Sequence, residues 1–476
     1  MHDLLQMTGW AVGILAALHA LLWKRDPRAA LGWISFCLLV PWLGALAYAL
    51  LGVNRLKTHA QQLGEDWPIC DDIAPGHAGA GSAGDPTCAV DLPPELAALD
   101  HLGQRVTGLP LVGGNRVQPL HDGEQAYPAM LDAIGRAART VWLSTYIFDT
   151  DGTGRAFIDA LAAAAARGLD VRVIVDGIGE KYSRPRAAKL LRARSVQVAR
   201  FLPPRLLKPN LHMNLRNHRK LLLLDGELAF TGGMNIGDRH LAGRLDNPRR
   251  VIDLQFRVEG PVVLQMEQIF LEDWAFATGT AVTPPRARSL PPVGPAACRS
   301  VTDGPDEDLD RLNWILHGAF AAARRRLVIM TPYFIPDRPL IAALVGVALR
   351  GVRVDIVLPG LNNLPYCHWA TRHLLWELLA HGVKVWYQPP PFVHSKLLLL
   401  DDAYALIGSA NIDSRSLRLN FELGLEVVDR DFNAELSDHV ERCLAVSRPV
   451  TQAEVDGRPF LVRVRDGLAR LASPYL

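Results

Sequence analysis

Cysteine is scarce in this chain, and the few cysteines are scattered. No two of them form a Cys-x-x-Cys pair, and none lies in a cluster with the spacing of a zinc site. Unpaired thiols indicate a reducing compartment, although Cys70 and Cys88 could form a disulfide in an oxidising one. The six positions are Cys37, Cys70, Cys88, Cys298, Cys367 and Cys443.

Lysine is also scarce, and the chain has no strong net charge. Only eight of the 51 basic residues are lysines, and the formal net charge of +2 says little by itself about partners. Two of the eight, Lys220 and Lys396, occupy equivalent places in a sequence that occurs twice. Arginine is used almost everywhere else, so lysine itself is specified at these two positions. The compact ammonium group of lysine can contact phosphate oxygens as a point charge.

The repeated sequence has the pattern His-x-Lys-x4-Asp-x6-Gly-x2-Asn, and its two copies are offset by 176 residues. Both copies also share the run Leu-Leu-Leu-Leu-Asp, so chance is a poor explanation and the chain contains a duplicated unit. The positions are His218, Lys220, Asp225, Gly232 and Asn235 in the first copy, and His394, Lys396, Asp401, Gly408 and Asn411 in the second.

The spacing of the motif predicts a shared pocket. A His and a Lys two residues apart point to the same face of a strand, and the four leucines with the Asp predict a buried strand that ends in a turn. If the copies pack about a pseudo-two-fold axis, two His, two Lys and two Asn side chains meet. Such a pocket supplies a nucleophile, an acid and cations for phosphoryl transfer without a metal or another cofactor. Asp225 and Asp401 belong to the motif's catalytic set, but at the ends of buried strands we expect them to hold local backbone.

Two such motifs in one chain resemble the phospholipase D superfamily and, within it, the bacterial cardiolipin synthases. The first copy continues as Thr-Gly-Gly-Met-Asn-Ile-Gly-Asp (231–238) and the second as Gly-Ser-Ala-Asn-Ile-Asp-Ser-Arg-Ser (408–416). Thr-Pro-Tyr-Phe-Ile-Pro (331–336) fits the same pattern, and the resemblance covers nearly the whole chain. It implies an α/β fold in which two tandem phospholipase D-type repeats form a pseudo-two-fold bilobal domain.

The resemblance also implies a reaction. A phosphatidyltransferase would make cardiolipin and glycerol from two phosphatidylglycerol molecules through a phosphatidyl-histidine intermediate, with His218 as nucleophile and His394 as general acid and base. The phosphate would be contacted by the motif lysines and asparagines, Lys220, Lys396, Asn235 and Asn411. A phospholipase D-type hydrolase, a nuclease of the same superfamily, or a transphosphatidylase that uses another alcohol or phosphatidylethanolamine would share these residues. A non-catalytic membrane scaffold is the remaining alternative, and the two intact motifs argue against it.

Two acids downstream of the motifs are candidates for orienting the histidines. An imidazole that acts as nucleophile needs its far nitrogen held by an acceptor, usually a carboxylate. Glu422 lies downstream of the second motif and Asp253 downstream of the first, at a different spacing. In the superfamily such acids pair across the repeats. The resemblance therefore implies Glu422 on His218 and Asp253 on His394.

Two long uncharged runs stand near the N-terminus. Residues 4–23 have about one membrane-spanning length, and residues 29–53 form a longer run that contains Pro41. We expect both to cross a bilayer; a cleaved signal peptide is the alternative for the first, but Met-His-Asp is not a basic n-region. Basic residues flank both ends of the second run, so they do not fix its orientation. The resemblance favours a multi-pass protein of the bacterial inner membrane with a cytoplasmic catalytic part.

Composition divides the chain into four parts. Residues 1–53 are the predicted two-helix anchor, and residues 54–109, rich in Gly, Ala, Asp and Pro, are a predicted flexible linker. Residues 110–283 and 306–476 are the predicted repeats, each with strand, helix and strand in the same order, which indicates an α/β sandwich. A Pro-rich joint at 284–305 is expected to separate them.

A basic segment lies in the first repeat. Residues 181–208 contain nine Lys or Arg residues and no acid, with apolar residues between them, and the segment extends to 215. It is either a contact with an anionic membrane surface or an ordinary solvated helix and loop. Nucleic acid is discounted because the chain is expected to be tethered to a membrane. The predicted partners are therefore phosphatidylglycerol and anionic membrane lipid, and the oligomeric state is not predicted.

Overall fold

The computed structural model describes residues 2–24, 27–52, 90, 92–203, 215–280, 282, 289–305 and 308–473. Cys70, Cys88 and residues 204–214 of the basic segment lie outside this set, so the disulfide and that part of the membrane contact stay predictions. The chain divides into an N-terminal unit and a second unit that holds every element from Pro94 onward. The other four cysteines are free and buried.

The N-terminal unit contains α1 (His2–Trp23), α2 (Pro27–Leu39), α3 (Pro41–Ala47) and the π-helical turn η1 (Tyr48–Gly52). Within α1, the stretch Gln6–Trp23 is long and apolar enough to cross a membrane. The second apolar run is not one helix, because Val40 adopts φ −134° and ψ 76° before Pro41, whose ring prevents the helix from continuing. Its path across a bilayer therefore stays a prediction.

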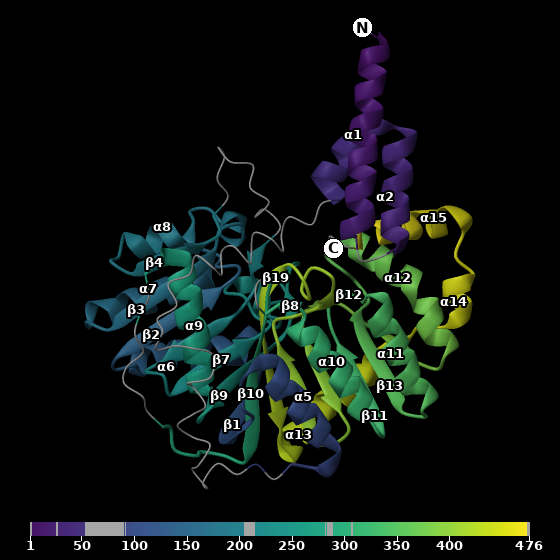
Figure 1. The fold of residues 1–476 in the computed structure, drawn as a ribbon. Helices are drawn as coiled ribbons and strands as arrows, with labels where there is room; N and C mark the ends of the chain where they lie inside the picture. The colour runs from purple at the N-terminus through teal and green to yellow at the C-terminus, as the bar shows by residue number, and fades with distance from the viewer. Residues whose placement is uncertain are drawn as a thin grey trace. The chain divides into compact units, whose positions relative to one another are not determined.

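The second unit is built on one long mixed sheet (Figure 1). From one edge to the other, the strand order is β4-β3-β2-β6-β7-β9-β1-β10-β19-β17-β16-β11-β13-β14-β20. The first half contains β1 (Val112–His121), α6 (Asp122–Arg136), β2 (Thr140–Thr145), α7 (Gly152–Ala166), β3 (Asp170–Asp176), η5 (Gly179–Tyr182), α8 (Ala187–Arg192), β4 (Gln197–Phe201), β5 (Arg216–Asn217), β6 (Leu221–Leu224), β7 (Leu228–Gly232), η7 (Asp238–His240), β8 (Val251–Ile252), β9 (Leu254–Glu259) and α9 (Val263–Thr278).

The second half repeats this topology. Outward from the central antiparallel pair of β1 and β10, the first half runs β9-β7-β6-β2-β3-β4 and the second β19-β17-β16-β11-β13-β14, with the same strand directions. The two tandem α/β repeats are thus confirmed. The second half contains β10 (Ala296–Asp303), α10 (Arg311–Ala322), β11 (Arg326–Met330), β12 (Phe334–Ile335), α11 (Arg338–Leu349), β13 (Arg353–Pro359), α12 (Pro365–Ala380), β14 (Lys384–Gln388), β15 (Phe392–Val393), β16 (Leu397–Leu400), β17 (Tyr404–Gly408), β18 (Ile412–Asp413), β19 (Asn420–Val428), α13 (Arg430–Val446), β20 (Arg448–Pro449), α14 (Gln452–Asp456) and α15 (Phe460–Leu471).

Three hydrophobic cores hold the sheet. One lies under α6, α7 and α8, a second under α10, α11 and α12, and a third is shared by both halves with α9 and α13. In β6, Leu221 and Leu223 enter the shared core, whereas Leu222 and Leu224 enter the core of the first half. The leucine runs are therefore uninterrupted because these central strands are buried on both faces.

The predicted linker and joint need correction. The segment η4 (Pro94–Leu96) and α5 (Ala97–Thr107) is helical, and Leu96 and Leu99 belong to the core of the second half, so the linker does not reach residue 109. In the predicted joint, residues 296–303 form β10, which is buried throughout and pairs with both β1 and β19. This strand was not predicted because the prolines that precede it are typical of a loop. The halves meet edge to edge inside one sheet.

Asp225 and Asp401 hold local backbone, and the structure does not bring them to the histidines. Asp225 follows β6 with a left-handed φ of 53°, and its carboxylate accepts three backbone N–H groups at 2.6–2.9 Å. Asp401 does the same after β16 at 2.7–3.1 Å. Both carboxylates therefore anchor the entry to the neighbouring strand, and a direct part in the chemistry stays a prediction. The donors are Ala138, Arg139 and Thr140 for Asp225, and Arg324, Arg325 and Arg326 for Asp401.

The variant Asp225→Asn should lower stability without changing the chemistry. The amide offers one acceptor oxygen in place of two and no charge, so the free energy of unfolding should fall by about 1–3 kcal/mol. Thermal unfolding of the purified protein measures this, with turnover assayed below the transition. Asp246→Asn, which removes a carboxylate that is 69% exposed, is the control. Equal shifts of the midpoint in both variants would contradict the anchoring role.

Candidate active site

Each motif histidine follows a short strand that pairs with the other repeat. β5 pairs in parallel with the start of β19, and the N–H of His218 donates to the carbonyl oxygen of Phe421 at 2.9 Å. β15 pairs in the same way with β8, and the N–H of His394 donates to the carbonyl oxygen of Ile252 at 2.8 Å. The two strand pairs therefore carry each histidine into the opposite repeat.

The cross-repeat contacts implied by the sequence are both present. Nδ1 of His218 lies 2.9 Å from Oε2 of Glu422, and Nδ1 of His394 lies 2.8 Å from Oδ2 of Asp253. Both carboxylate side chains are fully buried, whereas the imidazoles keep 11% and 13% of their surface exposed. Because the carboxylate accepts the proton on Nδ1, Nε2 is the nitrogen left to act on a substrate.

The two carboxylates are held differently. Glu422 accepts hydrogen bonds from Oγ of Ser409 at 2.5 Å and from Nδ2 of Asn420 at 3.0 Å. The position equivalent to Ser409 in the first repeat is Gly233, where a Cβ would lie 2.4 Å from Oδ1 of Asp253, so a side chain cannot be accommodated without a shift. Asp253 accepts instead the backbone N–H of the following residue at 2.9 Å. The motif is duplicated, but the surroundings of its histidines are not.

The two motif lysines lie beside the histidines. Nζ of Lys220 donates to the carbonyl oxygen of His218 at 2.7 Å, and Nζ of Lys396 donates to the carbonyl oxygen of His394. Nζ of Lys396 also lies 2.9 and 3.2 Å from the two ring nitrogens of His394. Burial lowers the pKa of Lys220 to about 7 and that of Lys396 to about 8, in spite of the nearby carboxylates. Each histidine thus has one lysine amine close to it, and the amine of Lys220 titrates near neutral pH.

Burial also sets the protonation of the histidine and carboxylate pairs. It lowers the pKa of His218 to about 4 and that of His394 to about 3, and the adjacent lysines act in the same direction. Burial alone would raise the pKa values of Glu422 and Asp253, but the neighbouring imidazole and ammonium groups lower both to about 2. At neutral pH the carboxylates are charged and the imidazoles are neutral.

We expect the free energy of unfolding to fall as the pH drops below about 6.5, the ordinary pKa of histidine. The folded-state pKa values of His218 and His394 are lowered, so the unfolded chain takes up protons that the folded chain does not, and stability is lost through this range. Each histidine contributes a slope of at most about 1.4 kcal/mol per pH unit. Glu422 and Asp253 extend this loss of stability below about pH 4. Their folded-state pKa values are lowered, so the stability that they contribute is complete above the pKa of the unfolded chain and is lost as the pH falls toward the folded-state pKa.

Denaturant titrations at several pH values between 5 and 7 measure this slope. The variant His394→Gln cannot take up the proton and should have a shallower slope than the parent chain. A slope that is the same in both proteins would show that His394 titrates normally in the folded state.

The two motif asparagines are buried, and part of each amide already has a partner. Oδ1 of Asn235 accepts the N–H of Ile147 at 3.1 Å, and Nδ2 of Asn411 donates to Oγ of Ser416 at 3.1 Å. Oδ1 of Asn411 has no hydrogen-bond partner in the described part of the chain. Contact of these amides with phosphate stays a proposal.

One residue beside the site, His240, was not predicted. It is 1% exposed, its Nε2 accepts the N–H of Asn235 at 3.3 Å, and its Nδ1 lies 3.9 Å from Oδ2 of Asp253. The repeat offset places Ser416 at the equivalent position, so the duplication could not reveal it. Its only trace in the sequence is the interval from Asn235 to Asp253, which is 18 residues, against 11 for the corresponding interval in the second repeat.

Comparison with known proteins decides the family. Residues 130–274 and 316–444 match the family described as "Cardiolipin synthase, PLD-like domain". The chain belongs to the cardiolipin synthase family. Residues 11–52 match the family described as "Phospholipase D-nuclease N-terminal", which agrees with membrane association of the first unit. The predicted superfamily is thus confirmed, and the chain is an enzyme of the phosphatidyltransferase type.

Full-length relatives support the same assignment. Cardiolipin synthase 1 of Staphylococcus epidermidis is 29% identical over 99% of this chain and 98% of its own length. Cardiolipin synthase A of Pseudomonas putida is 30% identical over 98% of this chain and 96% of its own length. The major cardiolipin synthase of Bacillus subtilis is 30% identical over 95% of this chain and 95% of its own length. The crystal structure of phosphatidylserine synthase from Haemophilus influenzae superposes with a TM-score of 0.64 over 79% of this chain and the whole of that chain. At 16% sequence identity, this similarity shows a shared fold.

Proposed function

We propose that this cardiolipin synthase transfers a phosphatidyl group from one phosphatidylglycerol molecule to a second one and releases glycerol. The observation that carries the proposal is the pair of histidines, each held at Nδ1 by a carboxylate of the other repeat and each accompanied by a lysine. One imidazole can attack phosphorus while the other protonates the leaving alcohol, which is what a two-step transfer requires.

In the first step, Nε2 of His218 attacks the phosphorus of the donor lipid, and the bond from phosphorus to the glycerol oxygen breaks. His394 gives a proton to the departing glycerol. In the second step, His394 takes the proton of the terminal hydroxyl of another phosphatidylglycerol, whose oxygen attacks phosphorus as the bond to His218 breaks. Cardiolipin leaves and both histidines are restored. The phosphodiester anion of the bound lipid favours the protonated form of His394, which the protein alone disfavours.

Lys220, Lys396, Asn235 and Asn411 are proposed to contact the non-bridging phosphate oxygens, where negative charge accumulates in the transition state. These four donors take the part that magnesium has in other phosphoryl-transfer sites, so no cofactor is included. Turnover of a short-chain, soluble phosphodiester should persist in EDTA. A collapse that one particular metal reverses at stoichiometric amounts would overturn this part of the proposal.

The proposal places the enzyme in the bacterial inner membrane as a multi-pass protein with its catalytic unit in the cytoplasm. α1 supplies one span, and α2 with α3 supplies the second pass. Phosphatidylglycerol and anionic membrane lipid are the partners, and nucleic acid is not. Protease access to the catalytic unit in sealed membrane vesicles of known orientation tests the side.

Lipid mass spectrometry after incubating the pure protein with phosphatidylglycerol vesicles tests the reaction. Cardiolipin and glycerol in equal amounts, without any nucleotide, are the expected products. A need for CDP-diacylglycerol would overturn the proposal, and phosphatidic acid as the only lipid product would mark a hydrolase. Vesicles that also contain phosphatidylethanolamine show which headgroup the enzyme prefers as donor.

A further inference from the structure

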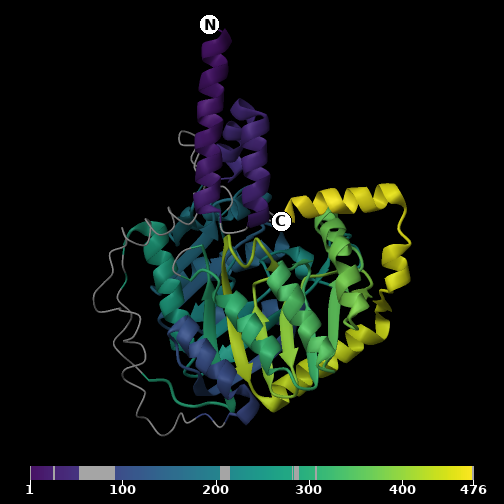
Figure 2. The same ribbon diagram turned by 45° about the vertical axis from the view of Figure 1, so that its right-hand side comes forward.

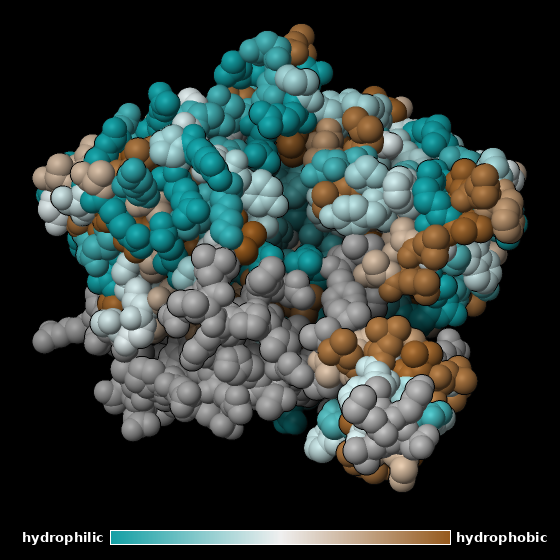
Figure 3. Space-filling model, turned by 90° about the horizontal axis from the view of Figure 1, so that it is seen from above, coloured by the Kyte–Doolittle hydropathy of each residue, from teal (hydrophilic) through white to brown (hydrophobic). Residues whose placement is uncertain are grey.

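The C-terminal helix α15 has a row of large apolar side chains turned to solvent. Phe460, Leu461, Leu468 and Leu471 are 63–77% exposed, and Val464 is 41% exposed. At 3.6 residues per turn, these five positions fall within an arc of about 100°. A brown stretch at the right of Figure 3 lies where α15 is seen in Figure 1. A contiguous exposed apolar surface of this kind indicates a site that binds another molecule or a membrane.

The opposite side of α15 is fixed to the protein, so the arc cannot turn inward. The buried carboxylate of Asp466 accepts hydrogen bonds from Arg372 of α12 and from Arg458 and Arg465. The guanidinium of Arg465 lies 4.5 Å from the ring centre of Trp369, also on α12. Figure 2 shows α15 lying across the outside of α12. These contacts hold the apolar arc outward.

Basic residues lie along one edge of the arc. On the helical wheel, Arg463 and Arg470 fall about 60–80° from its nearest member. The side chain of Arg463 forms no hydrogen bond or ion pair with any residue in the described part of the chain, and Nη1 of Arg470 lies 3.4 Å from His373. An apolar face with cations at its edge suits the boundary between the acyl chains and the headgroups of an anionic bilayer.

We propose that α15 lies in the surface of the membrane, with its apolar arc among the acyl chains and Arg463 and Arg470 at the headgroup phosphates. The partner is the anionic phospholipid bilayer in which a cardiolipin synthase finds its substrate. The inference concerns docking and does not depend on which histidine is the nucleophile. It predicts a second contact with the bilayer, separate from the N-terminal unit.

Photo-crosslinking of the full chain in vesicles of phosphatidylglycerol and phosphatidylcholine tests this. A benzophenone side chain placed by Leu461→p-benzoylphenylalanine should yield lipid adducts in mass spectra, whereas the same group at Leu245, an 81% exposed leucine in the first repeat, should not. Adducts with a second copy of the chain, or equal lipid labelling at both positions, would overturn the proposal. This readout does not need catalysis, so it is independent of the proposed reaction.

Kinetics supply a second test. Leu461→Asp with Leu468→Asp should raise the lipid concentration for half-maximal turnover by a factor on the order of ten and leave turnover at saturation unchanged, because docking and not chemistry is weakened. The control Leu245→Asp should change neither. An equal half-saturating concentration in the double variant and the control would contradict membrane docking.

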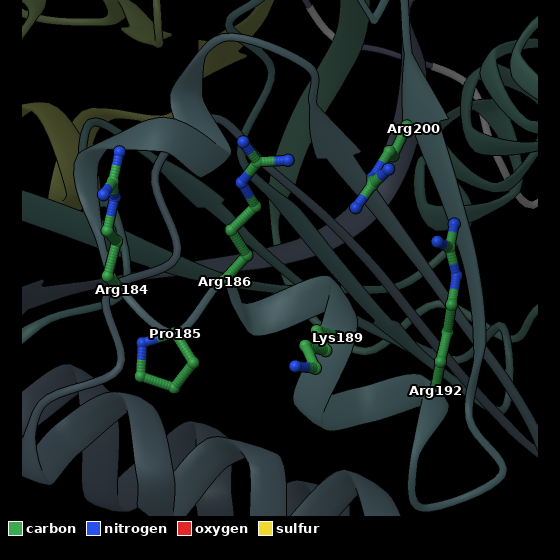
Figure 4. Close-up of a pocket in the computed structure, with 6 residues that line it drawn as sticks. All are labelled: Arg184, Pro185, Arg186, Lys189, Arg192 and Arg200. Carbon is green, nitrogen blue, oxygen red and sulfur yellow. The ribbon is translucent and has the colours of Figure 1, made fainter.

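A different observation, in the first repeat, points to a separate anion site. A cavity of about 500 Å³ is lined by five basic residues and a proline (Figure 4). The lining comes from the loop before α8, from α8 itself and from β4. The residues are Arg184, Pro185, Arg186, Lys189, Arg192 and Arg200.

The charge in this cavity is largely uncompensated. Within the described residues, Glu180 is the only acid that forms an ion pair with the lining: its Oε2 lies 3.1 Å from Nε of Arg200 and its Oε1 lies 3.6 Å from Nη1 of Arg186. The side chains of Arg184 and Lys189 are exposed and form no hydrogen bond or ion pair in that part of the chain. Five cations against one carboxylate favour an anion in the cavity.

Two aromatic ring contacts lead from the loop that lines the cavity to the catalytic site. Tyr182, two residues before Arg184, has its ring centre 6.3 Å from that of Tyr146, which lies 5.1 Å from the ring centre of His218. We infer that the cavity holds the headgroup phosphate of an anionic phospholipid that is not being transferred. Of the two interpretations of the basic segment, this inference favours a lipid contact, and it rests on the enzyme acting at a membrane.

Native mass spectrometry of the full chain in detergent, with added phosphatidylserine, tests the cavity. The triple variant Arg184→Gln, Lys189→Gln and Arg192→Gln should retain one anionic lipid fewer than the parent. The matched control Arg105→Gln, Arg116→Gln and Arg155→Gln loses the same charge at exposed sites and should retain as many as the parent. Equal retention in the two triple variants would overturn the inference, as would displacement of the lipid by inorganic phosphate or by a short DNA at similar concentration.

Discussion

Replacing either motif histidine by alanine should lower turnover by a factor on the order of 10⁴ or more, because nucleophile and acid act as a unit. His218 and His394 are the only histidines in the described chain that a carboxylate of the other repeat holds at Nδ1 within hydrogen-bond distance. Without His218 no bond to phosphorus can form, and without His394 glycerol must leave unprotonated. Cardiolipin formation from phosphatidylglycerol vesicles measures the loss, and His101→Ala, which changes an exposed histidine on α5, is the control.

The same variants separate the two roles. With a donor lipid whose leaving group needs no protonation, His394→Ala should still accumulate a phosphatidyl-enzyme, whereas His218→Ala should not. Intact-protein mass spectrometry after an acid-free quench detects the adduct, because a bond from phosphorus to histidine is labile in acid. An adduct that survives in His218→Ala and is lost in His394→Ala would reverse the assignment. Losses of less than about tenfold in both variants would remove the histidines from the mechanism.

Lys396→Arg should lower turnover about a hundredfold or more, in the range of lost oxyanion-hole donors, although the charge is kept. Lys396 is 5% exposed and its Nζ lies within 3.2 Å of both ring nitrogens of His394, so the larger planar guanidinium cannot take its place. Turnover at saturating lipid is the quantity to measure, with circular dichroism as a check on folding. Near-normal turnover would show that Lys396 is structural.

A comparison with Lys384→Arg sharpens this test. Lys384 begins β14 and is exposed, so the same substitution there should change turnover little. A similar loss in both variants would trace the effect to general disruption of the second repeat. A loss confined to Lys396→Arg would support contact between this ammonium group and the phosphate.

Much of the site could be predicted from the sequence because the duplication is visible in it. Two copies of one motif in fixed register predict two equivalent strand ends, and the structure places His218, Lys220, His394 and Lys396 in such positions. The contact of Glu422 with His218, implied by the family resemblance, is also present. By contrast, the duplication does not reveal His240, because Ser416 occupies the equivalent position in the second repeat; the longer interval from Asn235 to Asp253, 18 residues against 11, is its only trace.

The sequence was least informative where a few residues act through distant packing. Residues 94–107 fall in the predicted linker, yet they are helical, because Leu96 and Leu99 pack in a core made by the second half. The apolar run of residues 29–53 has the length of a span, yet one proline divides it. Local composition indicates which secondary structure a segment prefers, but it does not show which distant part of the chain the segment packs against.

The sequence by itself determined that this protein has two repeats with one His and one Lys each at matching positions. It did so because the two copies of the motif keep the same residues at the same spacing. The family resemblance implies that each histidine meets the acid of the other repeat, but only the tertiary structure showed how: β5 pairs with β19, and β15 pairs with β8. It alone showed which backbone N–H groups Asp225 and Asp401 hold, and that the apolar arc of α15 is exposed. These are contacts between segments far apart in the chain, and local sequence preferences do not encode which distant segments meet.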